Sequence, residues 1–278
     1  MYRPVPHRAP ADGDVESLRR GWSPPNPNEE VAMLRTNVAD GIHCVEDSYV
    51  NWFIVEDDSG LTVVDAGLPT SWESLLQALS ELDRRLRDIK ALLLTHGHFD
   101  HLGFAERLRS HVGVPVYIHD NDIPLTRHPR QYGRDRPLTW YLLTQFKALP
   151  MVAEFAKNRA WWPRPVEQVH RIRETTLSVP GAPRVLFTPG HTLGHCAFHF
   201  PERDTVVAGD AVVTLDPYRG TRRPQIVSRA ATVDPERALR SLDVLADTGA
   251  RTVLTGHGAA WTEGVERLVE SALQHGSS

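Results

Sequence analysis

The 278-residue chain is poor in cysteine, with Cys44 and Cys196 as its only two. Two cysteines in a chain of this length build no disulfide framework, and these are too far apart in sequence for a cysteine zinc site. A low cysteine content suits a reducing compartment. We therefore expect a cytoplasmic protein without disulfide bonds.

Lysine and net positive charge are also scarce. Of the 31 basic residues, only Lys90, Lys147 and Lys157 are lysines, and the formal net charge is −4. A chain without a positive excess does not generate the field that attracts nucleic acid. We therefore expect no nucleic-acid partner and attribute the excess of arginine to codon bias.

Long apolar runs are missing as well. No run approaches the roughly 20 residues that span a bilayer, and residues 1–30 lack the apolar stretch of a signal peptide. That segment instead contains six prolines, which is typical of a mobile or loosely docked arm. Because 41% of all residues are apolar, the remaining chain can form one large domain. We expect a Pro-rich arm over 1–30, a single domain over 31–278 and no membrane partner.

Histidine, by contrast, is plentiful, and three of the 14 histidines fall in one short motif. His96, His98 and His101 lie with Asp100 in the segment 95–103 (THGHFDHLG), directly after an apolar run. Imidazoles and a carboxylate at one strand end are suited to zinc or iron. Gly97 allows a sharp turn, so side chains two positions apart can converge. The motif predicts a metal site.

Four more ligand-type residues stand at or just beyond the ends of other apolar runs. These residues are Asp65, His191, Asp210 and His257. In an α/β architecture the carboxyl ends of strands lie along one edge, so five such loops can meet in one place. The separate motifs therefore predict one composite site.

Together, these motifs resemble those of the metallo-β-lactamase superfamily of metallo-hydrolases, in particular its glyoxalase II-like and lactonase-like branch. The resemblance extends from about residue 31 to the end of the chain. It implies an α/β fold, the αββα metallo-β-lactamase sandwich, which pairs two similar halves.

The resemblance also implies roles for the motif residues. The first metal would be held by His96, His98 and His191. The second would be held by Asp100, His101 and His257. Asp210 would bridge both ions, and Asp65 would accept a hydrogen bond from a ligand histidine and fix its orientation. Seven ligands suit two divalent ions that each keep an open position for water or substrate. We expect zinc as the metal, with iron and manganese left open.

Other features set limits on the resemblance. His195 follows His191 by four residues, but we expect it not to be a ligand. The β-lactam-hydrolysing branch with a cysteine ligand would have Cys where Asp210 stands, so an antibiotic-resistance lactamase is disfavoured.

The segment 121–169 is long for a connection, and connections of this length usually have a function. Its apolar and aromatic residues recur at helical spacing, which predicts a helical cap insertion over the metals. Arg130 and Trp140 are predicted to contact the substrate, as is Tyr218 from a later loop. The alternative interpretation is that the aromatic residues fill a helix–body interface and the arginines form a solvated loop.

Local signals predict further elements. Residues 57–60 (DDSG) predict a hairpin turn, and Thr70 or Ser71 predicts the start of a helix that runs to about Arg87. A strand is expected near 176–179. Asp234 followed by Pro235 predicts a helix start, with the aspartate as N-cap.

The expected activity is hydrolysis of an ester, thioester or lactone by a hydroxide that bridges two metals. Asp100 and Asp210 would orient this nucleophile and shuttle its proton. The partner would be a small-molecule acyl substrate, and a homodimer is left open.

The chain continues only about twenty residues beyond His257, without the helical extension that supports glutathione in hydroxyacylglutathione hydrolases. Two alternatives stay open: an iron-dependent persulfide dioxygenase-like oxidoreductase, and a phosphodiesterase.

Overall fold

A tight turn organises the first sheet. The computed structural model describes residues 32–129, 131, 133, 149–160 and 162–276, and the chain from Ala32 onward forms one compact unit. The segment 57–60 joins β3 (Val50–Asp57) to β4 (Gly60–Val64), and the side chain of Asp57 accepts hydrogen bonds from the backbone N–H and the hydroxyl of Ser59. Gly60 has φ +138°, which only glycine adopts readily. The predicted turn is confirmed.

The first sheet has seven strands in sequential order. Its remaining strands are β1 (Met33–Ala39), β2 (Ile42–Asp47), β5 (Ile89–Leu93), β6 (Val116–Ile118) and β7 (His170–Arg171). Pairing is antiparallel from β1 to β4 and parallel from β4 to β7. Parallel strands need crossover connections, which bring the ends of β4, β5 and β6 to one edge.

The second sheet has the order β13-β10-β9-β8. Its strands are β8 (Arg184–Phe187), β9 (Cys196–Phe200), β10 (Thr205–Gly209) and β13 (Thr252–Thr255). β10 is parallel to β13 and antiparallel to β9, which is itself antiparallel to β8. β8, β10 and β13 therefore all end at the same edge. A separate hairpin, β11 (Val213–Asp216) and β12 (Thr221–Gln225), follows β10.

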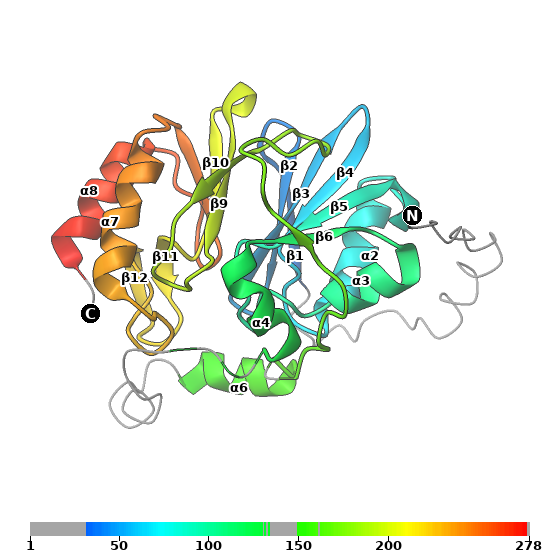
Figure 1. Ribbon diagram of the computed structural model, residues 1–278, viewed down its shortest axis with the longest axis horizontal. Helices are drawn as coiled ribbons and strands as arrows, with labels where there is room; N and C mark the ends of the chain where they lie inside the picture. Colours follow the sequence, from blue (N-terminus) through cyan, green and yellow to red (C-terminus); the bar gives the residue numbers. More distant parts are fainter. Residues whose placement is uncertain (1–31, 130, 132, 134–148, 161, 277–278) are drawn as a thin grey trace, which may run out of the picture. The chain divides into compact units, whose positions relative to one another are not determined.

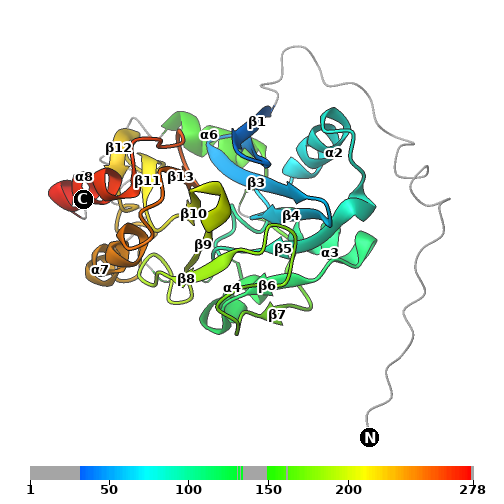
Figure 2. The same ribbon diagram turned by 90° about the horizontal axis from the view of Figure 1, so that it is seen from above.

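The two sheets pack face to face between two pairs of helices (Figure 1). α2 (Ser71–Glu81) and α3 (Ala105–Val112) lie outside the first sheet, and α7 (Pro235–Ala246) and α8 (Val265–His275) lie outside the second. The same layers are visible from above in Figure 2.

Separate clusters of buried apolar side chains fill the layers. Phe53 of the first sheet shares a cluster with Phe198 and Val207 of the second. Trp52 packs with residues of α2 and α3, and Val253 with residues of α7 and α8. Because each sheet is apolar on both faces, each must be covered on both sides. The predicted αββα sandwich is confirmed.

The helix predicted from Thr70 or Ser71 to Arg87 is too long. α2 ends at Glu81, since Asp83 has φ +53° and leaves the helical path. The chain then forms a short 3-10 turn, η1 (Leu86–Asp88). Leu86 packs on the same core as the apolar face of α2, which explains why the apolar period continues past the helix.

The start of α7 follows the prediction. The side chain of Asp234 accepts a hydrogen bond from the backbone N–H of Arg237 (2.9 Å), and Pro235 is the first helical residue. The strand predicted near 176–179 is wrong, because only an isolated bridge between Thr176 and Arg184 forms there.

The predicted cap segment, 121–169, is described in part. It contains the end of η2 (Asp120–Asp122), then α4 (Ile123–Arg127) and α6 (Leu149–Lys157). Phe155 of α6 meets Phe99 of the His-rich motif edge to face, with ring centroids 6.1 Å apart. α6 therefore packs on the loop that carries the predicted ligands. None of the helices in the described part of the chain is long and apolar enough to cross a membrane.

Candidate metal centre

Five loops place the predicted ligand residues at one edge of the sandwich. Asp65 follows β4, and the His-rich motif follows β5. On the second sheet, His191 lies in the loop after β8, Asp210 follows β10, and His257 follows β13. All these strands end at the same edge, so the topology makes the loops converge. The candidate site lies where these five loops meet.

The structure brings the predicted ligands into two buried groups. In each group the potential ligand atoms all lie within 4.8 Å of one another, and every residue is buried. The first group is His96, His98 and His191. The second group is Asp100, His101 and His257. Both match the division that the resemblance implies.

Asp210 lies between the two groups. Its carboxylate is 3.4 Å from Nε2 of His191 in the first group. It is also 3.2 Å from Nε2 of His257 and 3.6 Å from Nε2 of His101 in the second. One carboxylate therefore reaches both groups, which is the position that a bridging ligand requires.

Asp65 orients two of the histidines. It is fully buried and has φ +62°, an uncommon conformation for a residue other than glycine. Oδ2 lies 2.9 Å from Nδ1 of His101 and accepts from the hydroxyl of Thr95, while Oδ1 accepts from the backbone N–H of Thr95. Asp65 also lies close to both His96 and His101, but its two oxygens are already engaged. It therefore acts on the orientation of its neighbours.

The same contacts set the tautomers of His96 and His101. Thr95 donates its hydroxyl proton to Asp65, so its oxygen accepts from Nδ1–H of His96 (2.9 Å). His101 donates Nδ1–H to Asp65. In both rings Nδ1 therefore faces the protein, and Nε2 is the nitrogen left to bind a metal.

His191 and His257 are held in the same way. The Thr232 hydroxyl donates to the carbonyl of Val227, so its oxygen accepts from Nδ1–H of His191 (3.4 Å). Nδ1 of His257 donates to the carbonyl of Tyr49 (2.7 Å). Both rings therefore also present Nε2 toward the site.

Several of these inward-facing atoms form no hydrogen bond in the described part of the chain. Among the buried side-chain atoms of the described residues that lack a hydrogen-bond partner are Nε2 of His96, His101 and His191 and Oδ1 of Asp210. Buried polar atoms are nearly always satisfied, so a cluster of unsatisfied ones facing a common point requires an explanation. Two imidazole-rich groups around a carboxylate fit divalent metal ions in their nature and number.

Glycine makes room for this arrangement. A Cβ on Gly256 would lie 2.1 Å from Oδ1 of Asp210 and 2.9 Å from the ring of His101. Only glycine can therefore precede His257 without displacing the bridging carboxylate.

The electrostatics divide the site into two parts in the metal-free protein. Burial lowers the pKa of His98 to about 3, and it holds the pKa of His96 and His191 well below the ordinary value. Burial also opposes a charged His101, but Asp210 and Asp65 raise its pKa to about 10. The first group is therefore neutral and ready to bind a cation, whereas a metal at the second group must displace a proton.

His195 lies beside the site but is fully engaged with the protein. Its Nε2 accepts the backbone N–H of Asp210 (3.1 Å), and its Nδ1 lies 2.8 Å from the hydroxyl of Thr188. With both nitrogens used, His195 has no lone pair for a metal. Its contact instead positions the backbone of Asp210.

Sequence reasoning missed two residues that hold the loops in place. The side-chain amide of Asn51 donates to the carbonyls of Thr255 and Gly258, on either side of His257. Asp122, which is fully buried, accepts hydrogen bonds from two other ligand loops. The only sequence signal for Asp122 is an acidic residue soon after a strand, the same pattern that marks Asp65.

The predicted substrate contacts are only partly covered. Arg130 and Trp140 lie outside the described residues. Tyr218 is partly buried in the connection between β11 and β12. Backbone N–H groups of Thr214 and Leu215 in β11 donate to the carbonyl of His257, so this hairpin is joined to the metal edge.

A family model supplies the class. The model described as Metallo-beta-lactamase superfamily matches residues 45–257, a span that includes all the predicted ligands. The chain belongs to this superfamily, as its motifs predict.

Individual relatives agree. The chain is 29% identical over 235 residues to the probable metallo-hydrolase YflN of Bacillus subtilis (strain 168), covering 81% of this chain and 86% of that protein. It is 31% identical over 162 residues to hydroxyacylglutathione hydrolase GloC of Haemophilus influenzae, covering 57% of this chain and 64% of that protein. Among solved structures, TTHA1623 in a di-iron-bound form shares 27% identity with a TM-score of 0.57, covering 80% of this chain and 93% of that one. The protein is thus a metal-dependent hydrolase of this superfamily with a buried, His-rich site.

Proposed function

We propose that the chain is a dinuclear hydrolase that cleaves a small-molecule ester, thioester or lactone. The observation that carries the proposal is the position of Asp210, whose carboxylate reaches both buried ligand groups. Two complete groups joined by one carboxylate suit a pair of ions better than a single one. The names of two relatives, a probable metallo-hydrolase and a hydroxyacylglutathione hydrolase, support hydrolysis, and the second is a thioesterase by name.

Seven residues would hold the ions in this proposal. His96, His98 and His191 would hold the first, and Asp100, His101 and His257 the second, with Asp210 shared. The di-iron form of TTHA1623 supports two ions and supports iron among the three candidate metals, zinc, iron and manganese.

The ions, once bound, would supply Lewis-acid chemistry by acidifying a water molecule and stabilising negative charge on an acyl oxygen. The chain's own residues would orient that water and move its proton. Asp100 is buried, its carboxylate lies 3.6 Å from Nε2 of His257, and burial raises its pKa. A carboxyl group whose pKa is raised toward neutrality is suited to accept and return a proton.

The hairpin β11–β12 is the described element best placed to contact the substrate. It is joined to the His257 loop, and Nη1 of Arg219 is buried without a hydrogen-bond partner. Tyr218 and Arg219 would therefore offer a ring and a cation beside the metal edge. Such a pair suits a substrate that carries a polar or anionic group next to its acyl bond.

Persulfide oxidation and phosphodiester cleavage remain weaker proposals. Oxidation on similar scaffolds uses a single facial site, and nothing in the second ligand group of this chain is missing. No observation on the described residues favours a phosphodiester over an acyl substrate.

Metal content and turnover of matched variants test the proposal. Zinc-, iron- and manganese-reconstituted protein should hold close to two ions and hydrolyse at least one member of a panel of thioesters, lactones and aryl esters. His191→Ala and His257→Ala should each lose one ion and nearly all turnover. His195→Ala should lose less metal than His191→Ala, because its nitrogens bond to the protein and it acts only through the backbone of Asp210. The exposed His111→Ala controls for loss of an imidazole. Full activity with one ion would refute the dinuclear assignment. Equal metal loss in His195→Ala and His191→Ala would refute the choice of His191 as the ligand.

A further inference from the structure

Asp122 is a buried carboxylate that touches neither ligand group directly. It ends η2, shortly after β6, and begins α4 as its N-cap residue. Its exposed fraction is 0%. Burying a carboxylate this deeply costs free energy unless its oxygens are well hydrogen-bonded. The groups that bond to Asp122 therefore indicate its role.

Among the described residues, three groups donate hydrogen bonds to its carboxylate, and all three belong to the loops of the first ligand group. The backbone N–H of Gly97, between His96 and His98, donates to Oδ2 (2.9 Å). The hydroxyl of Thr192, next to His191, donates to the same oxygen (2.6 Å). The backbone N–H of Gly194 donates to Oδ1 (2.7 Å). One carboxylate therefore ties the end of β5 in the first sheet to the loop after β8 in the second.

Close packing reinforces the link. A Cβ on Gly194 would lie 2.6 Å from Oδ1 of Asp122, and a Cβ on Gly97 would lie 2.5 Å from the side chain of Leu125 in α4. Asn121 adds a bond from its side-chain amide to the carbonyl of Leu193 (3.1 Å). The turn from η2 to α4 is thus wedged between the two loops, and both loops need glycine where they meet it.

We propose that Asp122 is a positioning residue that sets the separation of His96 and His98 from His191 and so determines the affinity of the first metal position. The proposal rests on the ligand assignment of the proposed function. Asp122 acts through the backbone on both sides of the ligands, in the way that outer hydrogen bonds orient the ligands of other metal sites. No hydrogen bond among the described residues joins Asp122 to Asp100, His101 or His257, so we expect the effect to fall mainly on the first position.

The test is a zinc titration of the full-length chain against a chromophoric chelator, which separates two dissociation constants. His191→Ala and His257→Ala identify which constant belongs to which position. Asp122→Asn keeps the shape but places an amide N–H₂ against at least one of the three donors. It should weaken zinc at the first position by roughly 10- to 100-fold, while the second changes little.

Two further variants sharpen the test. Asp120→Asn lies two residues away, on an exposed carboxylate that pairs with Arg171, and it should leave both constants unchanged. Thr192→Val removes one donor but keeps the carboxylate and its charge. It should weaken zinc binding at the first position selectively, though less than Asp122→Asn does. If Asp122→Asn does not fold, Thr192→Val tests the proposal in its place.

The possible outcomes separate the two proposals. A purely structural Asp122 would lower thermal stability without changing the ratio of the two constants, and that result overturns the positioning role alone. Equal weakening of both positions also overturns it, because it would indicate a general charge effect. If His191→Ala fails to remove one ion, the ligand assignment of the proposed function is wrong.

Discussion

At the scale of single residues, what a histidine does depends on what each of its two nitrogens touches. His191 and His195 stand four residues apart and are both buried. Nδ1 of His191 is hydrogen-bonded to Thr232 and its Nε2 faces Asp210, whereas both nitrogens of His195 form hydrogen bonds with the protein. The same residue type therefore serves as a candidate ligand at one position and as a backbone support at the other.

Asp216 provides a prediction about stability at this scale. It is fully buried, Oδ2 has no hydrogen-bond partner, and burial raises the pKa of its carboxyl to about 6. Because the folded state holds the proton more tightly than the unfolded state, Asp216 contributes stability at low pH that is lost as the pH rises from about 4 to about 6. Asp216→Asn should be more stable than the parent at pH 7, by at most about 3 kcal/mol. The gain should vanish below about pH 4, where both states are protonated in the parent.

Urea unfolding of both proteins between pH 3 and pH 8 measures this difference. Asp247→Asn, at an exposed position, serves as the control for the substitution itself. A stability difference between Asp216→Asn and the parent that does not change with pH would contradict the explanation.

At the scale of elements, the loops at strand ends carry the site, and their glycines set its geometry. β10 ends at Gly209 before Asp210, and β13 is followed by Gly256 before His257. Parallel pairing of these strands brings the two loops together, and a backbone bond from Gly256 N–H to the carbonyl of Gly209 (2.8 Å) fixes their register. The bridging carboxylate depends on this local backbone as much as on its own side chain.

Gly256→Ala is the corresponding prediction. The added methyl would collide with Asp210 and His101, so one of the two must move. A displacement of about 1 Å at such a site is expected to lower kcat/KM by about 100-fold, with weaker binding of at least one ion. Steady-state kinetics on the best substrate and elemental analysis measure both effects.

Gly113→Ala is the matched control. Gly113 has φ +77° at the end of α3, but nothing lies within 4 Å of a Cβ there. It should cost about 1–2 kcal/mol of stability and leave kcat/KM unchanged. Normal turnover in Gly256→Ala would mean that the Asp210 carboxylate tolerates displacement and is not the shared ligand.

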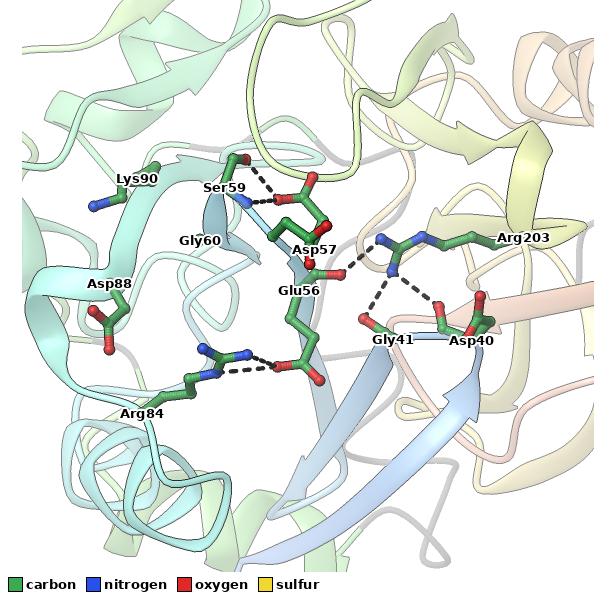
Figure 3. A pocket seen from close by; sticks show the side chains of 11 residues that line it. Asp40, Gly41, Glu56, Asp57, Ser59, Gly60, Arg84, Asp88, Lys90 and Arg203 are labelled. Carbon is green, nitrogen blue, oxygen red and sulfur yellow. Dashed lines mark hydrogen bonds and ion pairs between the residues drawn. The ribbon is translucent and has the colours of Figure 1, made fainter.

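At the scale of the whole molecule, the candidate metal site and a set of contacts that join the two sheets lie at opposite edges of the sandwich. Gly60 begins β4 at the edge opposite to Asp65, which follows the end of the same strand. At that far edge is a charged hollow of about 560 Å³ (Figure 3). Arg84 pairs there with Glu56, and Asp57 accepts from Ser59 and Gly181. Because Arg84 is paired with Glu56 and Asp57 is hydrogen-bonded to neighbouring segments, the hollow is a junction between elements.

Arg203 is central to this junction. It ends η4 (Pro201–Arg203), which connects β9 to β10 in the second sheet. Its guanidinium donates to the carbonyls of Asp40, Gly41 and Glu56 in the first sheet and its turns (2.7–2.9 Å). Arg203→Lys keeps the charge but cannot make all three bonds. It should lower the free energy of unfolding by about 1–2 kcal/mol.

Metal content and kcat/KM should not change in Arg203→Lys, since the metal edge is at the other end of the strands. Exposed Arg267→Lys serves as the control for the substitution itself. A loss of activity without a loss of stability would show that the far edge is coupled to the chemistry.

The sequence by itself determined the class of fold and the side chains predicted as metal ligands, which the structure brings together. Ligand-type residues at the ends of apolar runs, together with glycines at the turns, are local features that a reader of the sequence can see. They carried the resemblance to the superfamily, which in turn implied the sandwich, and they predicted that these side chains meet at one edge. Strong local signals, such as Asp234 before Pro235 and the turn at 57–60, also predicted the structure correctly, because capping and turn formation depend on only a few neighbouring residues.

Only the tertiary structure decided which partner each polar group meets. The bond from the backbone of Asp210 to His195, the orientation of His101 by Asp65, and the link through Asp122 all join residues 15 or more positions apart. No local pattern encodes such contacts, because they depend on how two sheets pack. The end of α2 was mispredicted for the same reason: Leu86 reaches the common core from a separate turn. Apolar periodicity records which side chains are buried, whereas the backbone path that buries them is set by the folded chain as a whole.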